Sequence, residues 1–240
     1  MSEEAPPAPK KKQPRSAKQV WREWGRPLLV FFIVTSVLRS SIADWNDVPT
    51  PSMTPNILAG DRIWVNKVAY DLKVPFTSLH LARWSNPETG DIVVFFSPAD
   101  KTRMVKRVIG RPGDEVMMVR NEVVINGDRT KYAPINPPTD AKEPTFWDEY
   151  HHYFLEKRPD GTNTIQTTPF VRARKWFPRV LVPDDHYLVL GDNRDQSSDY
   201  RSFGFVPRSA IIGQATSVVL SFDRDKGWSP RWHRFFTALK

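Results

Sequence analysis

The sequence predicts a mainly β protein, an antiparallel β domain with a β-rich or irregular inserted subdomain, preceded by a single N-terminal transmembrane helix. Three observations support this class. Short apolar runs of strand length, separated by turn signals, dominate the chain after residue 43. One longer apolar run follows a basic N-terminal segment. The 240 residues, 40% of them hydrophobic, suffice for one sizeable core plus an anchor.

Residues 1–26 form a basic tail, and residues 27–43 are the predicted transmembrane anchor. The apolar run Pro27 to Leu38 is short for a bilayer, which normally takes about 20 residues to cross. Arg26 and Arg39 flank it roughly 20 Å apart, a gap that snorkelling side chains extend. Tryptophans near both ends suit lipid interfaces. The basic excess predicts a cytoplasmic N-terminus with everything after the anchor outside.

Two other interpretations of this segment remain open. Small residues in Ser41-Ile42-Ala43 follow a basic and then an apolar stretch, which is also the pattern of a cleaved secretory signal. A buried core helix is the third interpretation, and the charge cluster upstream makes it less attractive.

The predicted β core comprises residues 44–130 and 181–222. Asn126-Gly127 between apolar runs predicts a tight hairpin. From 131 to 180 the pattern loosens into proline, aromatic and charged residues, which predicts an inserted subdomain of unknown role. Residues 223–240 form a C-terminal aromatic and basic segment. The strands are expected at Asp61–Val65, Asp91–Phe96, Val105–Ile109, Val116–Val119, Val123–Ile125 and Tyr187–Leu190.

Composition limits the chemistry. The formal net charge of +8 admits nucleic acid, anionic membrane or acidic substrates as partners. Because the basic residues precede the apolar run, a lipid bilayer is expected and nucleic acid is not. The chain contains no cysteine, so thiolate chemistry is excluded. None of the five histidines has convincing partners, and we expect no metal and no cofactor.

Three polar clusters are candidates for the chemistry. Ser52 lies between prolines in Thr50-Pro51-Ser52-Met53-Thr54-Pro55, where a stiff loop can expose a hydroxyl. Lys106 lies within an apolar strand, on the face of Met104 and Val108, where burial lowers an amine pKa. A solvent-facing lysine is the ordinary alternative. The third cluster, residues 191–207, is a polar, turn-rich loop after an apolar strand.

Together these clusters, in this order behind an N-terminal anchor, resemble the bacterial type I signal peptidases, Ser/Lys enzymes that remove signal peptides from exported preproteins. The resemblance covers Val48–Val65, Gly90–Val119 and Asp185–Gly213. It implies that Ser52 is the nucleophile and Lys106 the general base. It also implies that Thr50 and the amide of Ser52 form the oxyanion hole. Ser197 matches the serine that orients the lysine, and Asp199 and Arg201 match a structural ion pair.

The resemblance further implies how a substrate would bind. The signal peptide would lie as an added strand, with Val48, Val94, Met104 and Val105 lining shallow pockets for small residues at positions one and three before the cut. The implied location is the bacterial cytoplasmic membrane, single-pass, with an extracytoplasmic catalytic domain. Thr50 and Met104 depart from the family's usual serine and aromatic residue. The alternatives are a conjugation-type or self-processing Ser/Lys protease, or a non-catalytic, membrane-tethered β domain that binds polypeptide.

Overall fold

The computed structural model describes residues 17–77, 79–138 and 150–239, without the side chain of Leu38. Residues 1–16 of the predicted tail and 139–149 of the predicted insertion therefore lie outside the described residues. The chain divides into two compact units, Met1–Arg39 and Ser40–Lys240.

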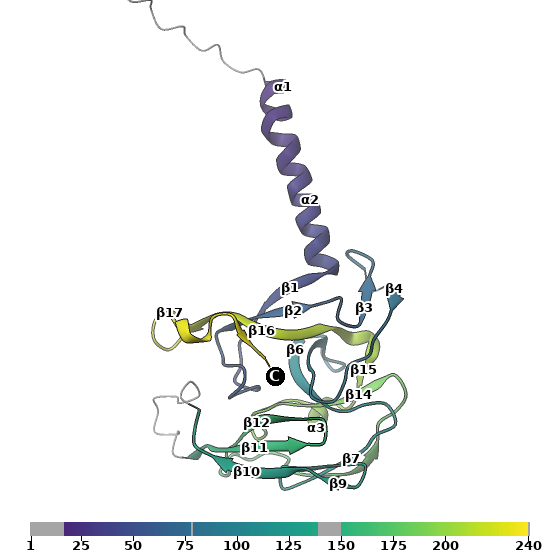
Figure 1. The fold of residues 1–240 in the computed structure, drawn as a ribbon, viewed down its shortest axis with the longest axis vertical. Coiled ribbons are helices and arrows are strands. Elements are labelled where there is room, and N and C mark those ends of the chain that lie inside the picture. The colour runs from purple at the N-terminus through teal and green to yellow at the C-terminus, as the bar shows by residue number, and fades with distance from the viewer. Residues whose placement is uncertain (1–16, 78, 139–149, 240) are drawn as a thin grey trace, which may run out of the picture. The chain divides into compact units, whose positions relative to one another are not determined.

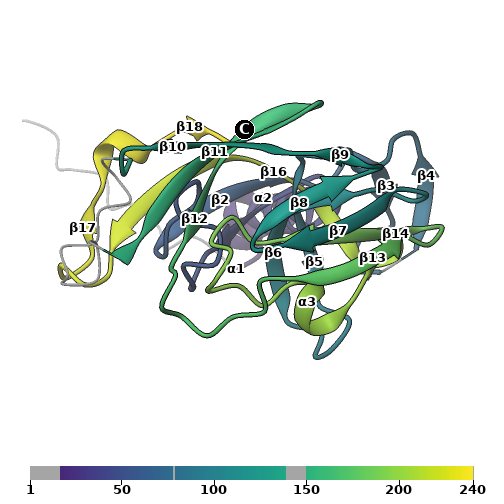
Figure 2. The ribbon, with the colours of Figure 1, turned by 90° about the horizontal axis from the view of Figure 1, so that it is seen from below.

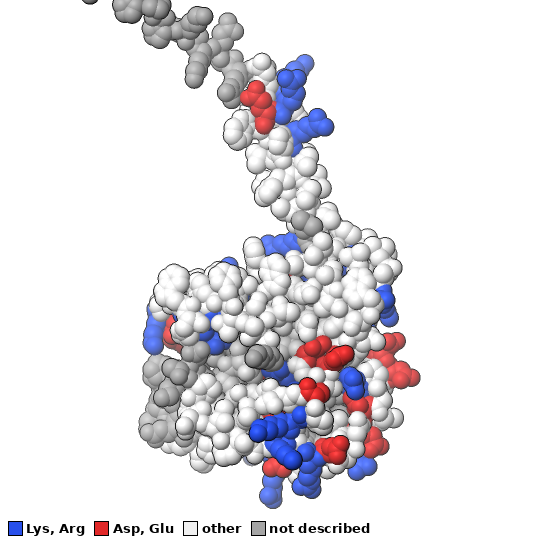
Figure 3. All heavy atoms as spheres, viewed as in Figure 1, with Lys and Arg blue, Asp and Glu red and all other residues white. Residues whose placement is uncertain are grey.

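The N-terminal unit is helical over its described residues. Helix α1 (Ala17–Val20), a π-helical segment (Trp21–Gly25) and α2 (Arg26–Ser41) follow one another directly. The described large apolar residues of α2 are exposed, from 37% at Val37 to 61% at Phe32. Figure 3 shows Lys and Arg at the N-terminal end of this helical run, followed by a band without charged side chains. No single helix in the described part of the chain is both long and apolar enough to cross a membrane.

The helix ends before the predicted anchor does. Helix α2 stops at Ser41 and strand β1 begins at Ala43, so the last two residues of the predicted 27–43 segment lie outside the helix. Two features of β1 account for the change from helix to strand. Asp44 is buried and Trp45 is exposed, as neighbouring residues of a half-buried strand are, and β1 pairs with β2 along its whole length, which commits this stretch to a sheet.

Unit Ser40–Lys240 is built on one curled antiparallel sheet of order β1-β2-β16-β5-β6-β14-β15, with β17 and β18 pairing with β16. Figure 1 shows β1, β2 and β16 toward one end of this unit. Strand β16 lies between β2 and β5, so it joins the two halves of the sheet. The bounds are β1 Ala43–Asp47, β2 Asp61–Asn66, β5 Ile92–Phe96, β6 Arg103–Gly110, β14 His186–Leu190, β15 Val206–Pro207, β16 Ile211–Asp223, β17 Ser229–Pro230 and β18 Thr237–Ala238.

Three smaller sheets complete the unit. Figure 2 shows β10–β12 and β7–β8 together when the molecule is seen from below. One small sheet has the order β10-β11-β12, another β13-β7-β8-β9, and β3 pairs with β4. Their bounds are β3 Asp71–Lys73, β4 His80–Arg83, β7 Glu115–Val119, β8 Glu122–Ile125, β9 Asp128–Arg129, β10 Lys131–Ile135, β11 His152–Arg158, β12 Gly161–Thr167 and β13 Phe177–Leu181. Short helices follow at α3 Tyr200–Phe203 and at the 3-10 turns Arg208–Ala210 and Trp232–Arg234.

The mainly β, antiparallel prediction is confirmed, and each expected strand is present within a few residues. The hairpin at Asn126-Gly127 is also confirmed, because both residues have positive φ and β8 pairs with β9 across them. The region predicted as loose, 131–180, holds four regular strands in its described part, β10 to β13.

The core forms on both faces of the main sheet. One cluster of buried side chains packs Val48, Met53 and Ile57 from the loop after β1 against β2, β5 and β16. A second packs Val93, Phe95 and Val108 against β14 and β15. Alternation along β5 sends Val93 and Val94 to different clusters, as a pleated strand requires. The loop that carries Ser52 is therefore fixed by apolar packing.

Candidate active site

Ser52 and Lys106, 54 residues apart in sequence, meet at hydrogen-bonding distance. Lys106 Nζ lies 2.7 Å from Ser52 Oγ, and it donates to the carbonyl oxygen of Val105 at 2.9 Å. Lys106 comes from the middle of β6, and Ser52 from the loop between β1 and β2. Both side chains are buried, with Lys106 only 2% exposed. A buried amine against a buried hydroxyl is the arrangement of a nucleophile and its base.

The surroundings of Lys106 favour its neutral form. Burial lowers the pKa of its amine to about 8 from 10.5, against the opposing effect of Asp199 and Asp192. Burial outweighs those two carboxylates, and each of them is paired with an arginine. Arg107 lies 2.8 Å from Asp192, and Arg201 lies 2.7 Å from Asp199. The neutral fraction near pH 7 is thereby raised by roughly two orders of magnitude over a free lysine.

The loop that carries Ser52 is tied to the third cluster through its backbone. The Asn193 backbone N–H donates to the carbonyl oxygen of Ser52 at 3.2 Å, and its side-chain amide donates to that of Pro51 at 3.2 Å. Met53 behind it is fully buried. These contacts hold the hydroxyl without using it, so Ser52 Oγ stays available for Lys106.

Thr50 lies at the exposed side of Ser52. Its hydroxyl donates toward Ser52 Oγ at 3.4 Å, and the threonine itself is exposed. A hydroxyl beside Ser52 Oγ and open to solvent can reach an oxygen that develops negative charge there.

Ser197 is close to the site but is not joined to Lys106. Its Oγ is buried and has no hydrogen-bond partner among the described residues. Gly191 explains its position, because a Cβ on this glycine would lie 2.1 Å from Ser197 Oγ and 2.5 Å from the carbonyl oxygen of Ser52. In this structure the carbonyl oxygen of Val105 holds the Lys106 amine instead.

The predicted ion pair of Asp199 and Arg201 is present and buried. Asp199 caps α3, accepting from the backbone of Arg201, and its other oxygen accepts from Gly191 N at 3.0 Å. The pair therefore braces the glycine that lies against Ser52 and Ser197.

A cavity of about 320 Å³ opens beside the two central residues. Val48 and Val94 are buried in its floor together with the partly buried Val105, and Met104 is partly buried in its lining. All four residues predicted to line the substrate pockets therefore lie in one cavity with Ser52 and Lys106. Its lining comprises Asn46, Asp47, Val48, Pro49, Thr50, Ser52, Ile63, Val94, Thr102, Arg103, Met104, Val105 and Lys106.

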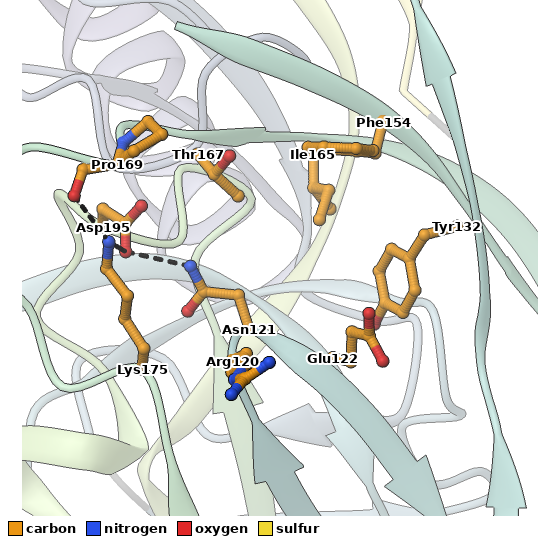
Figure 4. Close-up of a pocket in the computed structure, with 10 residues that line it drawn as sticks. All are labelled: Arg120, Asn121, Glu122, Tyr132, Phe154, Ile165, Thr167, Pro169, Lys175 and Asp195. Atoms are coloured by element: carbon orange, nitrogen blue, oxygen red, sulfur yellow. Dashed lines mark hydrogen bonds and ion pairs between the residues drawn. The ribbon is translucent and has the colours of Figure 1, made fainter. Parts of the chain in front are cut away.

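A second cavity, of about 210 Å³, shows how the third cluster is anchored on its other side (Figure 4). Asp195 accepts from Asn121 Nδ2 at 2.9 Å and from Thr168 N at 2.7 Å, with Lys175 Nζ 3.7 Å away. The loop after β14 is thus fixed to the smaller sheets as well. The lining residues are Arg120, Asn121, Glu122, Tyr132, Phe154, Ile165, Thr167, Pro169, Lys175 and Asp195.

Sequence reasoning missed three parts of this site: Gly191, Asn193 as a support of the Ser52 loop, and the carbonyl of Val105. A glycine directly before a polar loop was the one available signal for close approach. Backbone carbonyls leave no trace in a sequence. No cluster of three potential metal ligands exists within the described ranges.

Comparisons with known proteins identify the class. The family model described as signal peptidase, peptidase S26, matches residues 21–220. The chain therefore belongs to the signal peptidase family S26, and within it to the type I signal peptidases, which are serine proteases.

Named relatives agree with this assignment. A probable signal peptidase I-2 of Synechocystis is 31% identical, covering 85% of this chain and 76% of that protein. Signal peptidase I of Haemophilus influenzae is 29% identical over 86% of this chain and 72% of its own length. Signal peptidase I of Buchnera aphidicola from Schizaphis graminum is 28% identical, over 83% and 75%. A crystal structure of a signal peptidase I from Enterococcus faecalis is 27% identical with a TM-score of 0.33, over 55% of this chain and 98% of that one.

Proposed function

We propose that this chain is a membrane-bound endopeptidase that removes N-terminal signal peptides from exported preproteins after small residues. Ser52 is the nucleophile and Lys106 the general base, and the 2.7 Å approach of the buried amine to the hydroxyl carries this assignment. Family membership supports the reaction class, and the absence of cysteine leaves a hydroxyl as the nucleophile.

The reaction has two halves. Ser52 Oγ attacks the carbonyl carbon of the residue before the cut while neutral Lys106 takes the hydroxyl proton. The oxyanion is met by the backbone N–H of Ser52 and the hydroxyl of Thr50. When the C–N bond breaks, Lys106 returns its proton to the leaving amine, which frees the mature protein. Lys106 then deprotonates a water that hydrolyses the acyl-enzyme, releasing the signal peptide and restoring Ser52.

The substrate strand lies along the free edge of β6. Strand β14 pairs with β6 only from Arg107 onward, which leaves residues 103–106 bonded on the β5 side alone. Strand β1 pairs only with β2 among the described strands, so its second edge is open as well. An extended peptide between these edges gains main-chain hydrogen bonds and places alternate side chains over Val48, Val94 and Val105. Because these valine side chains fill the floor of the cavity, only small substrate side chains fit above them.

The helical N-terminal unit is the proposed membrane anchor. Its support is the uncharged stretch 27–38 between Arg26 and Arg39, with apolar side chains exposed along α2. The proposed orientation is a cytoplasmic N-terminus and an extracytoplasmic catalytic unit in a bacterial cytoplasmic membrane. Alkaline extraction of cell membranes tests this, and recovery of the whole protein in the extracted supernatant would contradict it.

The central test is cleavage of an exported preprotein by the detergent-solubilised chain. Ser52→Ala and Lys106→Ala should each lower kcat/KM by at least about 10³-fold while the far-ultraviolet circular dichroism stays unchanged. Ser202→Ala and Lys157→Ala, both exposed, are the matched controls. If Lys106→Ala cleaves as fast as the parent, the mechanism is wrong. Mapping of the cleavage site separates signal-peptide removal from a conjugation-type or self-processing protease.

A further inference from the structure

The outer end of the active-site cavity is crossed by a side chain that the mechanism does not use. Arg103, at the start of β6, donates a hydrogen bond from Nη1 to Asn46 Oδ1 of β1, and the same nitrogen lies 3.6 Å from the carboxylate of Asp44. Strands β1 and β6 are not neighbours, because β2, β16 and β5 lie between them in the sheet. This contact therefore joins two separate walls of the cavity, and we call it the Arg103 bridge.

Both ends of the Arg103 bridge are held in place. On β1, Asp44 is mostly buried, and its carboxylate lies 3.6 Å from Lys67 Nζ and accepts from the backbone of Trp45. On β6, the guanidinium of Arg103 lies over the ring of Phe96, 5.7 Å from its centroid. Stacking on the ring and pairing at the tip both favour this position of the guanidinium. The Arg103 side chain is 41% exposed, so the bridge forms a solvent-facing rim of the cavity.

The position of this rim along the substrate follows from strand geometry. A peptide paired with β6 advances about 3.3 Å per residue, so the side chains at positions one and three before the cut are about 7 Å apart. For a peptide that runs parallel to β6 with position one beside Ser52 and Lys106, position three lies two residues earlier along β6, at the level of Met104 and Arg103. Arg103 and Val105 share a face of β6, so the guanidinium stands over the same floor as Val105.

We propose that Arg103, held by Asn46 and Asp44, closes the outer end of the cavity and limits the size of the residue accepted at position three before the cut. This inference rests on the proposed function. The floor of Val48, Val94 and Val105 sets the depth of the pocket, and the Arg103 bridge sets its length. Removing the guanidinium opens that rim and admits a longer side chain.

The test uses preproteins that differ only at position three (Ala, Val, Leu or Phe) or only at position one (Ala, Ser or Leu), cleaved by the full chain in detergent. Arg103→Ala should raise kcat/KM for Leu relative to Ala at position three by about 10-fold or more. The same ratio at position one should stay within about 2-fold of the parent, since position one lies beside Lys106, three residues along β6 from Arg103. Asn46→Ala removes the partner of Arg103 on β1. It should also raise kcat/KM for Leu relative to Ala at position three.

Two variants serve as controls. Asn46→Asp keeps an oxygen partner for Arg103 and should retain the parent's selectivity. Arg179→Ala removes an exposed arginine that pairs with Glu115 outside the cavity, and it should change neither ratio. If Arg103→Ala leaves the position-three ratio unchanged, or lowers cleavage of all substrates equally, the bridge does not set specificity. If the parent itself cleaves no preprotein, the proposed function fails, which is a different result.

Discussion

Gly191 and Ser197 approach so closely that a single methyl group on the glycine would lie 2.1 Å from the serine hydroxyl. The same methyl would lie 2.5 Å from the carbonyl oxygen of Ser52. Non-bonded carbon and oxygen atoms cannot come this near, so one of the two segments must move. The loop after β14 therefore sets the position of Ser52.

Gly191→Ala should for this reason reduce cleavage by about 100-fold or more, because a shift of about 1 Å in a nucleophile has that effect. Gly161→Ala is the matched control, since a methyl group on that glycine would meet no atom within 4 Å beyond its chain neighbours. Preprotein cleavage and thermal melting of both variants check this. Parent-like activity of Gly191→Ala would show that the loop adapts without moving Ser52.

The activity should depend on the titration of Lys106. Burial lowers the pKa of its amine to about 8, and in the proposed mechanism the neutral form is the base. Cleavage should therefore rise with pH up to about 8 and level off above it. A profile of kcat/KM against pH on one preprotein measures this. A rate that falls between pH 7 and 8 would be inconsistent with a neutral Lys106 as base.

The same burial should lower stability near neutral pH. The folded pKa of Lys106, about 8, lies below its ordinary 10.5, so the unfolded chain binds its proton more tightly. This loss of unfolding free energy is fully present below pH 8 and disappears as pH rises toward 10.5. Lys106→Met should thus raise the free energy of unfolding at pH 7 by about 1–3 kcal/mol, with a smaller gain at pH 10. Urea unfolding of parent and variant at both pH values tests this difference, and an equal gain at both would contradict it.

Glu156 should be the most costly carboxylate to remove outside the active site. It is fully buried, 2.7 Å from Arg194 and 2.8 Å from Arg158. Burial alone would raise its pKa, but the two arginines and Tyr132 hold the pKa down to about 2. Glu156→Gln leaves two buried cations short of an anion and should cost about 3–5 kcal/mol of unfolding free energy. Glu115→Gln, at an exposed pair, should cost less than about 1 kcal/mol in the same urea titration.

The sign of the pH dependence follows from the lowered pKa of Glu156. The contribution of Glu156 to the free energy of unfolding is present above pH 4.5, the pKa of its carboxyl in the unfolded chain. It is lost as pH falls toward 2. The parent should therefore lose more stability on acidification through this range than Glu156→Gln does. If the free energy of unfolding of the two proteins falls by the same amount over this pH range, the assignment is refuted.

Apolar alternation made the strands of the main sheet predictable, and it also explains what was missed. Strands β2, β5, β6 and β14 carry valine, isoleucine and leucine at buried positions, so their period is visible in the sequence. In β11 and β12 the buried positions include Glu156, Arg158, Asn163 and Gln166. Charged and amide side chains that satisfy one another inside the fold look like loop composition, because a sequence does not show their partners.

The site likewise contains residues that the sequence predicts and residues that it does not. Ser52 and Lys106 are predictable because the three clusters occur together and in order, and the structure places the two side chains in contact. The predicted role of Ser197 stays a prediction, since no hydrogen bond joins it to Lys106 in the described chain. Nothing near Arg103 in the sequence indicates its role, because its partner Asn46 on β1 is 57 residues away. A long-range contact between strands that are not neighbours has no local signature.

The order of strands in the main sheet bears on when the enzyme first becomes competent. One wall of the cavity belongs to β1 and β2 and the other to β5 and β6, and only β16, residues 211–223, hydrogen-bonds to both halves among the strands described. The ribosome makes Ser52 and Lys106 long before it makes β16. A nascent chain thus holds both residues of the proposed dyad before β16 can join the two halves of the sheet, so proteolytic activity should await the synthesis of β16.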